Sequence, residues 1–220
     1  RAMFSLMEAE KSLEHLDNPC LSGLVHRTKG HIYGAECLFQ NALEEYQKSK
    51  EYFDKAELPI HSAYALYNIA NAYSKLRDYD NAIKYLLKSE EQFSENGYSL
   101  YQFETQIELC YNYLQIDDFN SCANVFARID KSAKIGYSYC DYYCIYAILS
   151  AHSGNFDDAK TYISKAKTEQ IINPMQLAYS EYIIIRLQGN DTEALNFHLQ
   201  MVAEQDKFVF NAINNSLLQS

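Results

Sequence analysis

The chain has 220 residues, of which 48% are apolar and 22% charged, with only 7 glycines and 3 prolines. Sheet proteins of this size usually carry more of these two residues at their turns, so the composition favours long helices joined by short connections. The formal net charge of -10 removes the general attraction on which nucleic-acid binding depends, and no apolar run reaches the length of a membrane span. Neither nucleic acid nor a bilayer is therefore expected as a partner of these residues.

The first expected element is a helix over residues 1–17, which ends before the break at Asn18 and Pro19. The last is a helix that runs to residue 220 without a capping glycine or proline. Because the chain begins at Arg1 inside an apolar-periodic pattern and closes on an open helix, we expect it to be a piece of a longer protein.

Between these ends, one segment recurs with a helical-repeat period. The clearest copies span residues 77–86 and 154–163, with relatives at 38–46, 117–122 and 189–197. Each copy is anchored by a small residue, and the gaps between the anchors are 40, 40, 37 and 35 residues. The anchors are Ala42, Ala82, Cys122, Ala159 and Ala194. This period is typical of a helix-turn-helix solenoid.

The unit that starts at Ala63 resembles the tetratricopeptide repeat (TPR) family. It reproduces the family's order of large, large, small, aromatic, small and large residues with Leu66, Ile69, Ala70, Tyr73, Ala82 and Leu86. The resemblance implies an all-α fold, a right-handed superhelical solenoid of antiparallel helix pairs with about five repeats plus terminal helices. We expect one domain over residues 1–220, with units near 1–17 (partial), 23–56, 63–96, 103–136, 140–173 and 175–208.

Polar and glycine residues are placed where such helices should begin and end. Asp78, Asp118, Asn155 and Asn190 are predicted N-caps of the second helices. Gly97 and Gly136 are predicted to take the left-handed conformation at helix C-termini.

The cysteines and histidines show no catalytic or metal-binding spacing. Cys110 and Cys122 fill the two small positions of one unit, so we expect them to touch, either as reduced thiols or, in an oxidising compartment, as a disulfide. Cys140 and Cys144 are expected to pack in the core. The six histidines are scattered, and no nucleotide or hydrolase motif occurs, so we expect no cofactor, no metal and no enzymatic activity.

The resemblance also implies where a partner would bind, because the first helix of each TPR unit lines a concave face. The candidate binding residues on that face are Arg27, His31, Tyr64, Tyr67, Asn68, Asn71, Lys75, Glu104, Glu108, Tyr111, Asp141 and Tyr179. Glu104 and Glu108 stand where chaperone-binding TPR proteins need cations, so a clamp for a peptide carboxylate is not expected. Asparagine amides and tyrosine rings favour an extended peptide or helix, although some of these rings could instead pack between units.

Two functional hypotheses follow. In the first, the chain is a protein- or peptide-binding module that resembles the TPR sensor region of Bacteroidetes membrane-associated regulators, which would place it in the periplasm. In the second, it is a cytoplasmic scaffold or a peptide-pheromone receptor. The partner is expected not to be strongly acidic, and its identity, like a homo-oligomeric state, is left open.

Overall fold

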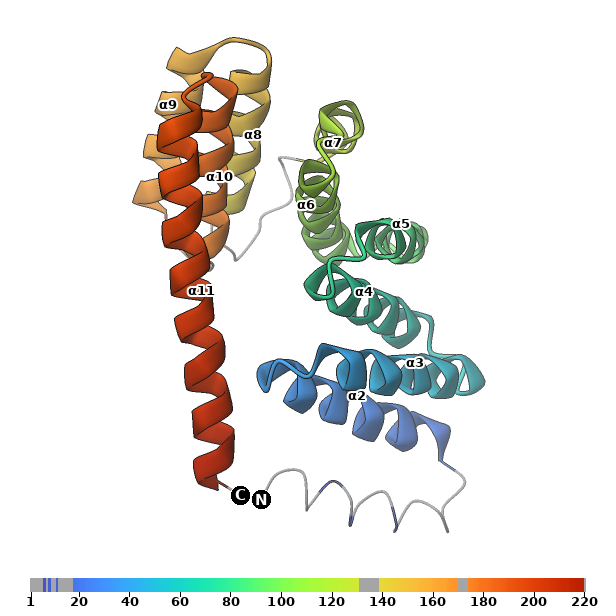
Figure 1. Cartoon of the computed structure of the whole chain (residues 1–220). Coiled ribbons are helices and arrows are strands. Elements are labelled where there is room, and N and C mark those ends of the chain that lie inside the picture. Colours follow the sequence, from blue (N-terminus) through green and yellow to red (C-terminus); the bar gives the residue numbers. More distant parts are fainter. Residues whose placement is uncertain are drawn as a thin grey trace. The chain divides into compact units, whose positions relative to one another are not determined.

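The computed structural model describes residues 18–130, 139–169 and 174–219 together with Leu6, Glu8 and Lys11; from residue 205 onward it describes little more than the backbone. Within these ranges all regular secondary structure is helical (Figure 1). The helices are α2 (Pro19–Ala35), α3 (Phe39–Lys55), α4 (Pro59–Lys75), α5 (Tyr79–Glu95), α6 (Ser99–Gln115), α7 (Phe119–Phe126), α8 (Cys140–His152), α9 (Phe156–Thr168), α10 (Pro174–Leu187) and α11 (Asp191–Gln219). The predicted all-α solenoid of helix pairs is confirmed. The helix expected over residues 1–17 and the glycine at 136 lie outside the described ranges.

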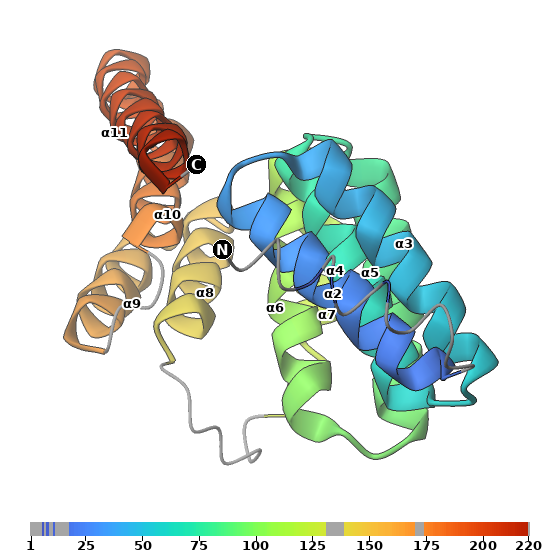
Figure 2. The ribbon, with the colours of Figure 1, turned by 90° about the horizontal axis from the view of Figure 1, so that it is seen from below.

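Contacts divide the chain into two units, which are described separately. Unit 1 comprises residues 1–112 and 210–220, and unit 2 comprises residues 113–209. In unit 1, helices α2 to α5 follow one another as antiparallel neighbours (Figure 1). Viewed from below, α3 and α5 lie along one side of this unit and α6 along the other (Figure 2).

The helices of unit 1 repeat with a regular spacing. Helices α2 to α6 each have 17 residues and are joined by connections of three residues, so a new helix begins every 20 residues. The pair therefore repeats every 40 residues, as the first two anchor gaps predict. Two buried hydroxyls repeat with the same period: Ser49 donates to the Gly23 carbonyl at 2.8 Å and Ser89 to the Ala63 carbonyl at 2.9 Å.

Each three-residue connection contains one residue in the left-handed region. Gly97, Gly154 and Gly189 take this conformation, with φ between 73° and 82°. The same conformation occurs at four residues that have a side chain, namely Cys37, Glu57, Arg77 and Asp117. The next N–H then donates to the carbonyl five residues earlier, at 3.0 Å from Asp78 to Tyr73 and at 2.9 Å from Tyr98 to Phe93. This is the Schellman arrangement that terminates a helix.

The predicted helix N-caps are confirmed at three positions. Side chains of Asp78, Asp118 and Asn155 accept hydrogen bonds from the backbone N–H three residues later, at 3.0 to 3.2 Å. Asn190 precedes α11 and donates from its amide to the Glu193 carboxylate at 2.5 Å.

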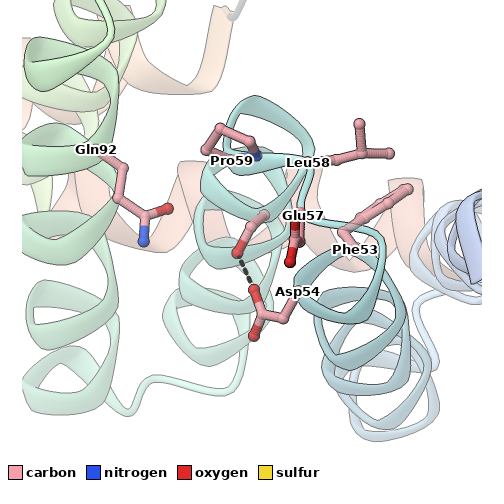
Figure 3. A pocket seen from close by; sticks show the side chains of 7 residues that line it. Phe53, Asp54, Glu57, Leu58, Pro59 and Gln92 are labelled. Carbon is pink, nitrogen blue, oxygen red and sulfur yellow. Dashed lines mark hydrogen bonds between the residues drawn. The ribbon is translucent and has the colours of Figure 1, made fainter.

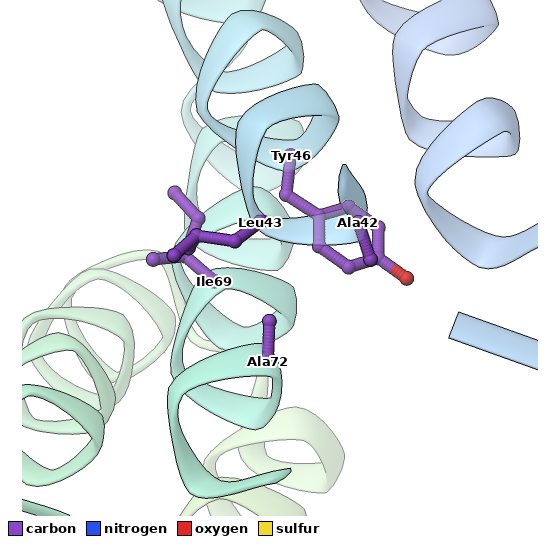
Figure 4. Close-up of a cluster of buried hydrophobic side chains, with 5 residues drawn as sticks. All are labelled: Ala42, Leu43, Tyr46, Ile69 and Ala72. Carbon is purple, nitrogen blue, oxygen red and sulfur yellow. The ribbon is translucent and has the colours of Figure 1, made fainter. Parts of the chain in front are cut away.

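The interior of unit 1 is formed where helix pairs stack. Ala42, Leu43 and Tyr46 of α3 pack with Ile69 and Ala72 of α4 in one buried cluster (Figure 4). On the other side, Tyr46 covers Gly30 of α2 so closely that a Cβ at position 30 would lie 2.4 Å from the ring. The small residue that the repeat requires at this position is therefore explained by one aromatic neighbour.

In unit 2, helices α8, α9 and α10 pack side by side (Figure 1). Tyrosines fill much of this packing: the ring centroids of Tyr146 and Tyr162 lie 3.9 Å apart. Cys140 and Cys144 are buried in α8, as expected for packing residues. Their burial raises the pKa of both thiols, to about 12 for Cys144.

Candidate functional site

The candidate residues of α4 and α6 share one face on each helix. Tyr64, Tyr67, Asn71 and Lys75 follow one another at intervals of three or four residues along α4, and Asn68 is the neighbour of Tyr67. Glu104, Glu108 and Tyr111 do the same along α6. Because residues three or four apart are neighbours on a helix surface, each set forms one stripe.

The structure brings the centres of these two stripes together. Tyr67 of α4 forms a side-chain hydrogen bond with Asn71 one turn away, and the carboxylates of Glu108 and Glu104 lie close enough to act on its hydroxyl. Burial, followed by these negative charges, raises the pKa of Tyr67 well above its usual range. We call Tyr67, Asn71, Glu104 and Glu108 the Tyr67 cluster. It combines an aromatic ring, a phenolic hydroxyl, an amide and two carboxylates.

Glu104 is an unusual member of this cluster. Its side chain is partly buried, and burial raises the pKa of its carboxyl above the ordinary value of 4.5. Among the described residues, no cation forms an ion pair with it. Glu104 and Glu108 are also the only charged residues of α6. A carboxylate desolvated in this way is energetically costly unless a donor or a cation reaches it.

The other candidates of α4 and α6 contribute to the structure as well as to this face. The ring of Tyr64 packs edge-on against Tyr101 at 4.5 Å and against Phe93 at 5.3 Å between centroids. Asn68 and Tyr111 are buried, with 9% and 5% of their surface exposed. Tyr64 therefore supports the interface between the α4–α5 pair and α6, and the other two side chains are largely withdrawn from solvent.

The α2 candidates form a separate basic and aromatic group in the first helix pair. His31 accepts or donates a hydrogen bond at 3.0 Å to the hydroxyl of Tyr46. Partial desolvation and the guanidinium of Arg27 lower the pKa of His31, and the same two causes lower the pKa of His61 on α4. Arg27 thus lies near both imidazoles and favours their neutral forms.

The remaining candidates do not join the Tyr67 cluster in the described contacts. Lys75 is exposed near the end of α4. Asp141 lies in unit 2, where its charge contributes to the raised pKa of Cys140. Tyr179, also in unit 2, donates from its hydroxyl to the Leu114 carbonyl at 3.2 Å, which gives it a structural role.

One surface pocket was not predicted from the sequence. It has a volume of about 320 Å³ and lies at the turn between α3 and α4 (Figure 3). Ser62 donates to Asp54 at 2.6 Å on its wall, and the amide oxygen of Gln92, which also lines the pocket, has no hydrogen-bond partner in the described part of the chain. The remaining lining residues are Phe53, Glu57, Leu58 and Pro59. Phe53 comes from the last turn of α3, Glu57 and Leu58 from the connection, and Pro59 from the start of α4. The repeat pattern does not predict ligand contacts in this region.

The structure contains no arrangement that points to metal chemistry within the described residues. No three His, Cys, Asp or Glu side chains in that part of the chain come together as metal ligands.

Cys110 and Cys122 are both buried and neither is in a disulfide. Their predicted contact would cross the boundary between the two units and stays a prediction. Among the described helices, none has the length and apolarity needed to cross a bilayer.

Comparison with known proteins supports the repeat architecture. A family model described as "Tetratricopeptide repeat" matches residues 63–93, which cover most of α4 and α5. No curated protein matches the chain significantly. Among solved structures, aspartyl phosphate phosphatase F from Bacillus subtilis matches with a TM-score of 0.70 and 16% identity. The match covers 92% of this chain and 55% of that protein, so this chain spans about half the length of that relative.

Two further structures have similar folds. NprR, solved in complex with its cognate peptide NprX, matches with a TM-score of 0.63 and 16% identity over 96% of this chain and 65% of NprR. YrrB, described as a TPR protein with an unusual peptide-binding site, matches with a TM-score of 0.52 and 15% identity over 92% of this chain and 96% of YrrB. At these identities the likeness establishes the fold.

Proposed function

We propose that this chain, whose residues 63–93 match the tetratricopeptide-repeat model, is a non-catalytic module that binds a peptide or an extended protein segment on the α4–α6 face. The Tyr67 cluster is the observation that carries this proposal. It combines a tyrosine ring that offers contact area, an amide and two carboxylate acceptors at one place. These groups come from α4 and α6, the first helices of two successive pairs. An extended peptide needs such groups, since amides bond its backbone and rigid rings contribute contact at low entropic cost.

The solved relatives are compatible with this proposal. NprR has been solved with its peptide NprX, and YrrB is described by its peptide-binding site. A phosphatase also shares the fold, so the fold alone does not decide between binding and catalysis. The proposal for this chain therefore rests on its own α4–α6 face.

We further propose that the module is the sensing part of a larger bacterial signalling or transcription regulator. A cytoplasmic scaffold or a peptide-pheromone receptor is the alternative. The protein's full gene distinguishes them, because an upstream signal sequence with a downstream membrane span supports the membrane-associated regulator. An N-terminal helix-turn-helix domain supports the receptor.

The binding proposal is tested by selecting ligands from a displayed library of random heptapeptides. We expect the wild-type chain to enrich a sequence family, and Tyr67→Ala with Asn71→Ala to lose affinity for it by at least about tenfold. Lys84→Ala with Glu91→Ala, two exposed changes on α5, should retain the affinity. Unchanged binding by the α4 variant, with its helical circular dichroism intact, would refute the proposed face.

A further inference from the structure

Three basic side chains come together where α2 meets α4 in unit 1. Arg27 and His31 lie one turn apart on α2, and His61 lies in the first turn of α4. The guanidinium of Arg27 is close enough to both imidazoles to act on their titration. We call these three residues the Arg27 cluster. Like the Tyr67 cluster, it is built from two successive first helices.

Helix α3 holds both imidazoles of this cluster in place. The hydroxyl of Tyr46 forms a hydrogen bond of 3.0 Å with Nδ1 of His31, and the ring of Phe53 stacks on His61 with 5.0 Å between centroids. Tyr46 and Phe53 are seven residues apart, so they project from the same side of α3. The hydrogen bond occupies one nitrogen of His31 and leaves the other available on an exposed residue.

No acid compensates the cluster among the described residues. Arg27 is half-buried and forms neither an ion pair nor a hydrogen bond within that part of the chain. The buried Nδ1 of His61 also has no hydrogen-bond partner there. The chain has 29 acidic and only 19 basic residues, so a guanidinium without a carboxylate is unusual in it. Because arginine keeps its charge and has five donors, it remains available to an acceptor on a ligand.

The basic character of these positions is specific to α2. In the 40-residue register of unit 1, residues 27 and 31 correspond to residues 67 and 71 of α4, which belong to the Tyr67 cluster. On α6 the same positions hold Ile107 and Tyr111, so uncharged residues satisfy the fold at both equivalent sites. Equivalent positions of successive repeats share one face. A peptide that lies on the Tyr67 cluster and continues towards α2 therefore reaches the Arg27 cluster.

A carboxylate is the group that these donors fit. A guanidinium donates two parallel hydrogen bonds to one carboxylate, and an imidazolium beside it adds a further charge-assisted donor. A negative charge at this place also opposes the effect of Arg27 on the two histidines, because it favours their protonated forms. An acidic residue on the ligand thus supplies the charge that the cluster lacks.

We propose that the peptide bound on the α4–α6 face extends to α2 and carries an acidic residue whose side-chain carboxylate is held by Arg27, His31 and His61. This inference rests on the proposed peptide-binding function and adds a second contact region with the chemistry of the residue that it reads. The Tyr67 cluster contacts the chain of the peptide, and the Arg27 cluster fixes its direction through one charge.

The test uses the full chain and the heptapeptides enriched from a library displayed with the peptide C-terminus joined to the display protein, so that only side-chain carboxylates are selected. We expect aspartate or glutamate to be enriched at one position. Its replacement by asparagine or glutamine should weaken binding at least about tenfold in fluorescence anisotropy. Amidation of the C-terminus of the synthetic peptide should leave the affinity unchanged, which separates a side-chain carboxylate from the terminal one.

Matched protein variants localise the effect. Arg27→Gln should weaken binding of the acidic peptide at least about tenfold and leave the affinity for its amide analogue unaffected. Lys84→Gln removes the same charge from an exposed position of α5 and should have no effect. Circular dichroism melts check that each variant is folded.

The outcomes separate this inference from the proposed function. Enriched peptides without an acidic residue, or equal binding by the Arg27→Gln variant, would overturn the inference and leave peptide binding standing. Loss of affinity on amidation would overturn the assignment to a side chain. A selection that enriches no peptide would overturn both the inference and the proposed function.

Discussion

At the scale of single residues, Glu104 is the side chain whose environment departs most clearly from what folding alone would favour. Its carboxyl is partly buried beside Glu108, and burial raises its pKa above 4.5. Folding therefore penalises the ionised form. This destabilising contribution is fully present above the raised pKa and disappears as the pH falls toward the value of the unfolded chain.

This environment predicts that Glu104→Gln stabilises the fold at neutral pH. We expect the melting temperature at pH 7 to rise by roughly 1–3 °C, a modest change because the side chain is only partly buried. The difference from wild type should vanish as the pH falls below about 4, where both chains are uncharged at this position. The exposed Glu91→Gln change is the control. A lower melting temperature for Glu104→Gln at pH 7 would show that the carboxylate has a stabilising role that the structure does not indicate.

Sequence reasoning identified the residues of this cluster but not their arrangement. Helical spacing was enough to place Tyr67 and Asn71 on one face, and the repeat register placed Glu104 and Glu108 on the next first helix. It could not show that Tyr64 packs between helix pairs or that Tyr179 donates to a carbonyl, because a tyrosine at a given repeat position has the same spacing in either role.

At the scale of helices and their connections, two aromatic residues explain why α2 contains glycine. A Cβ at Gly30 would lie 2.4 Å from the ring of Tyr46, and one at Gly23 would lie 2.7 Å from Phe53. Both glycines are thus required by the packing of α3 against α2, although glycine lowers the helical propensity of α2.

Two alanine substitutions on the same helix test this explanation. Gly30→Ala should destabilise the protein by about 1–3 kcal/mol through overpacking against Tyr46. Gly34→Ala should instead stabilise it by about 0.5–1 kcal/mol, because its Cβ would meet only the Tyr46 hydroxyl at 3.8 Å and alanine favours the helix. Urea denaturation measures both free energies of unfolding. Equal effects of the two substitutions would contradict the close contact.

The helix connections contain features that the residue pattern did not reveal. Glycine at 97, 154 and 189 indicates left-handed turns, but Cys37, Glu57, Arg77 and Asp117 adopt the same conformation without it. The hydrogen bonds that terminate each helix impose it, at a cost of about 1 kcal/mol for a residue with a Cβ. For this reason a helix end marked by glycine can be predicted from the sequence. The helix ends at Cys37, Glu57, Arg77 and Asp117 are recognised only from the 20-residue spacing of the helices in the structure.

Arg77→Gly is predicted to stabilise the protein. The exposed arginine has φ of 61°. Glycine removes the strain of this conformation but also gains freedom in the unfolded chain. The net increase in the free energy of unfolding should be about 0.5 kcal/mol. Lys84→Gly, an exposed change within α5, should decrease it by about 1 kcal/mol. Loss of stability in both variants, again in urea, would show that the left-handed conformation carries no strain.

At the scale of the whole molecule, the repeat divides its residues into those that build the solenoid and those that remain for recognition. Small anchors and large apolar residues at fixed positions repeat because each helix pair buries its apolar face against the next. This regularity is why the fold was predictable from one sequence. The surface pocket at Asp54, Ser62 and Gln92 was not, since it arises at one turn and has no repeated pattern.

The cysteines give a prediction for the chain as a whole. Cys20 and Cys37 are half-buried, whereas Cys110, Cys122 and the α8 pair are buried. Ellman's reagent should therefore modify about two thiols rapidly in the native protein and six in denaturant without reductant. Four thiols in denaturant would support the alternative reading in which Cys110 and Cys122 form a disulfide.

The central claim is that the α4–α6 face of this helical-repeat protein binds a peptide through the Tyr67 cluster. Photo-crosslinking with the selected heptapeptide, carrying benzophenone at its central position, tests this most directly when the modified fragments are identified by mass spectrometry. We predict crosslinks within residues 64–75 and 101–115, and their loss in the Tyr67→Ala/Asn71→Ala variant. Crosslinks confined to α3 and α5, or unchanged labelling of that variant, would contradict the claim.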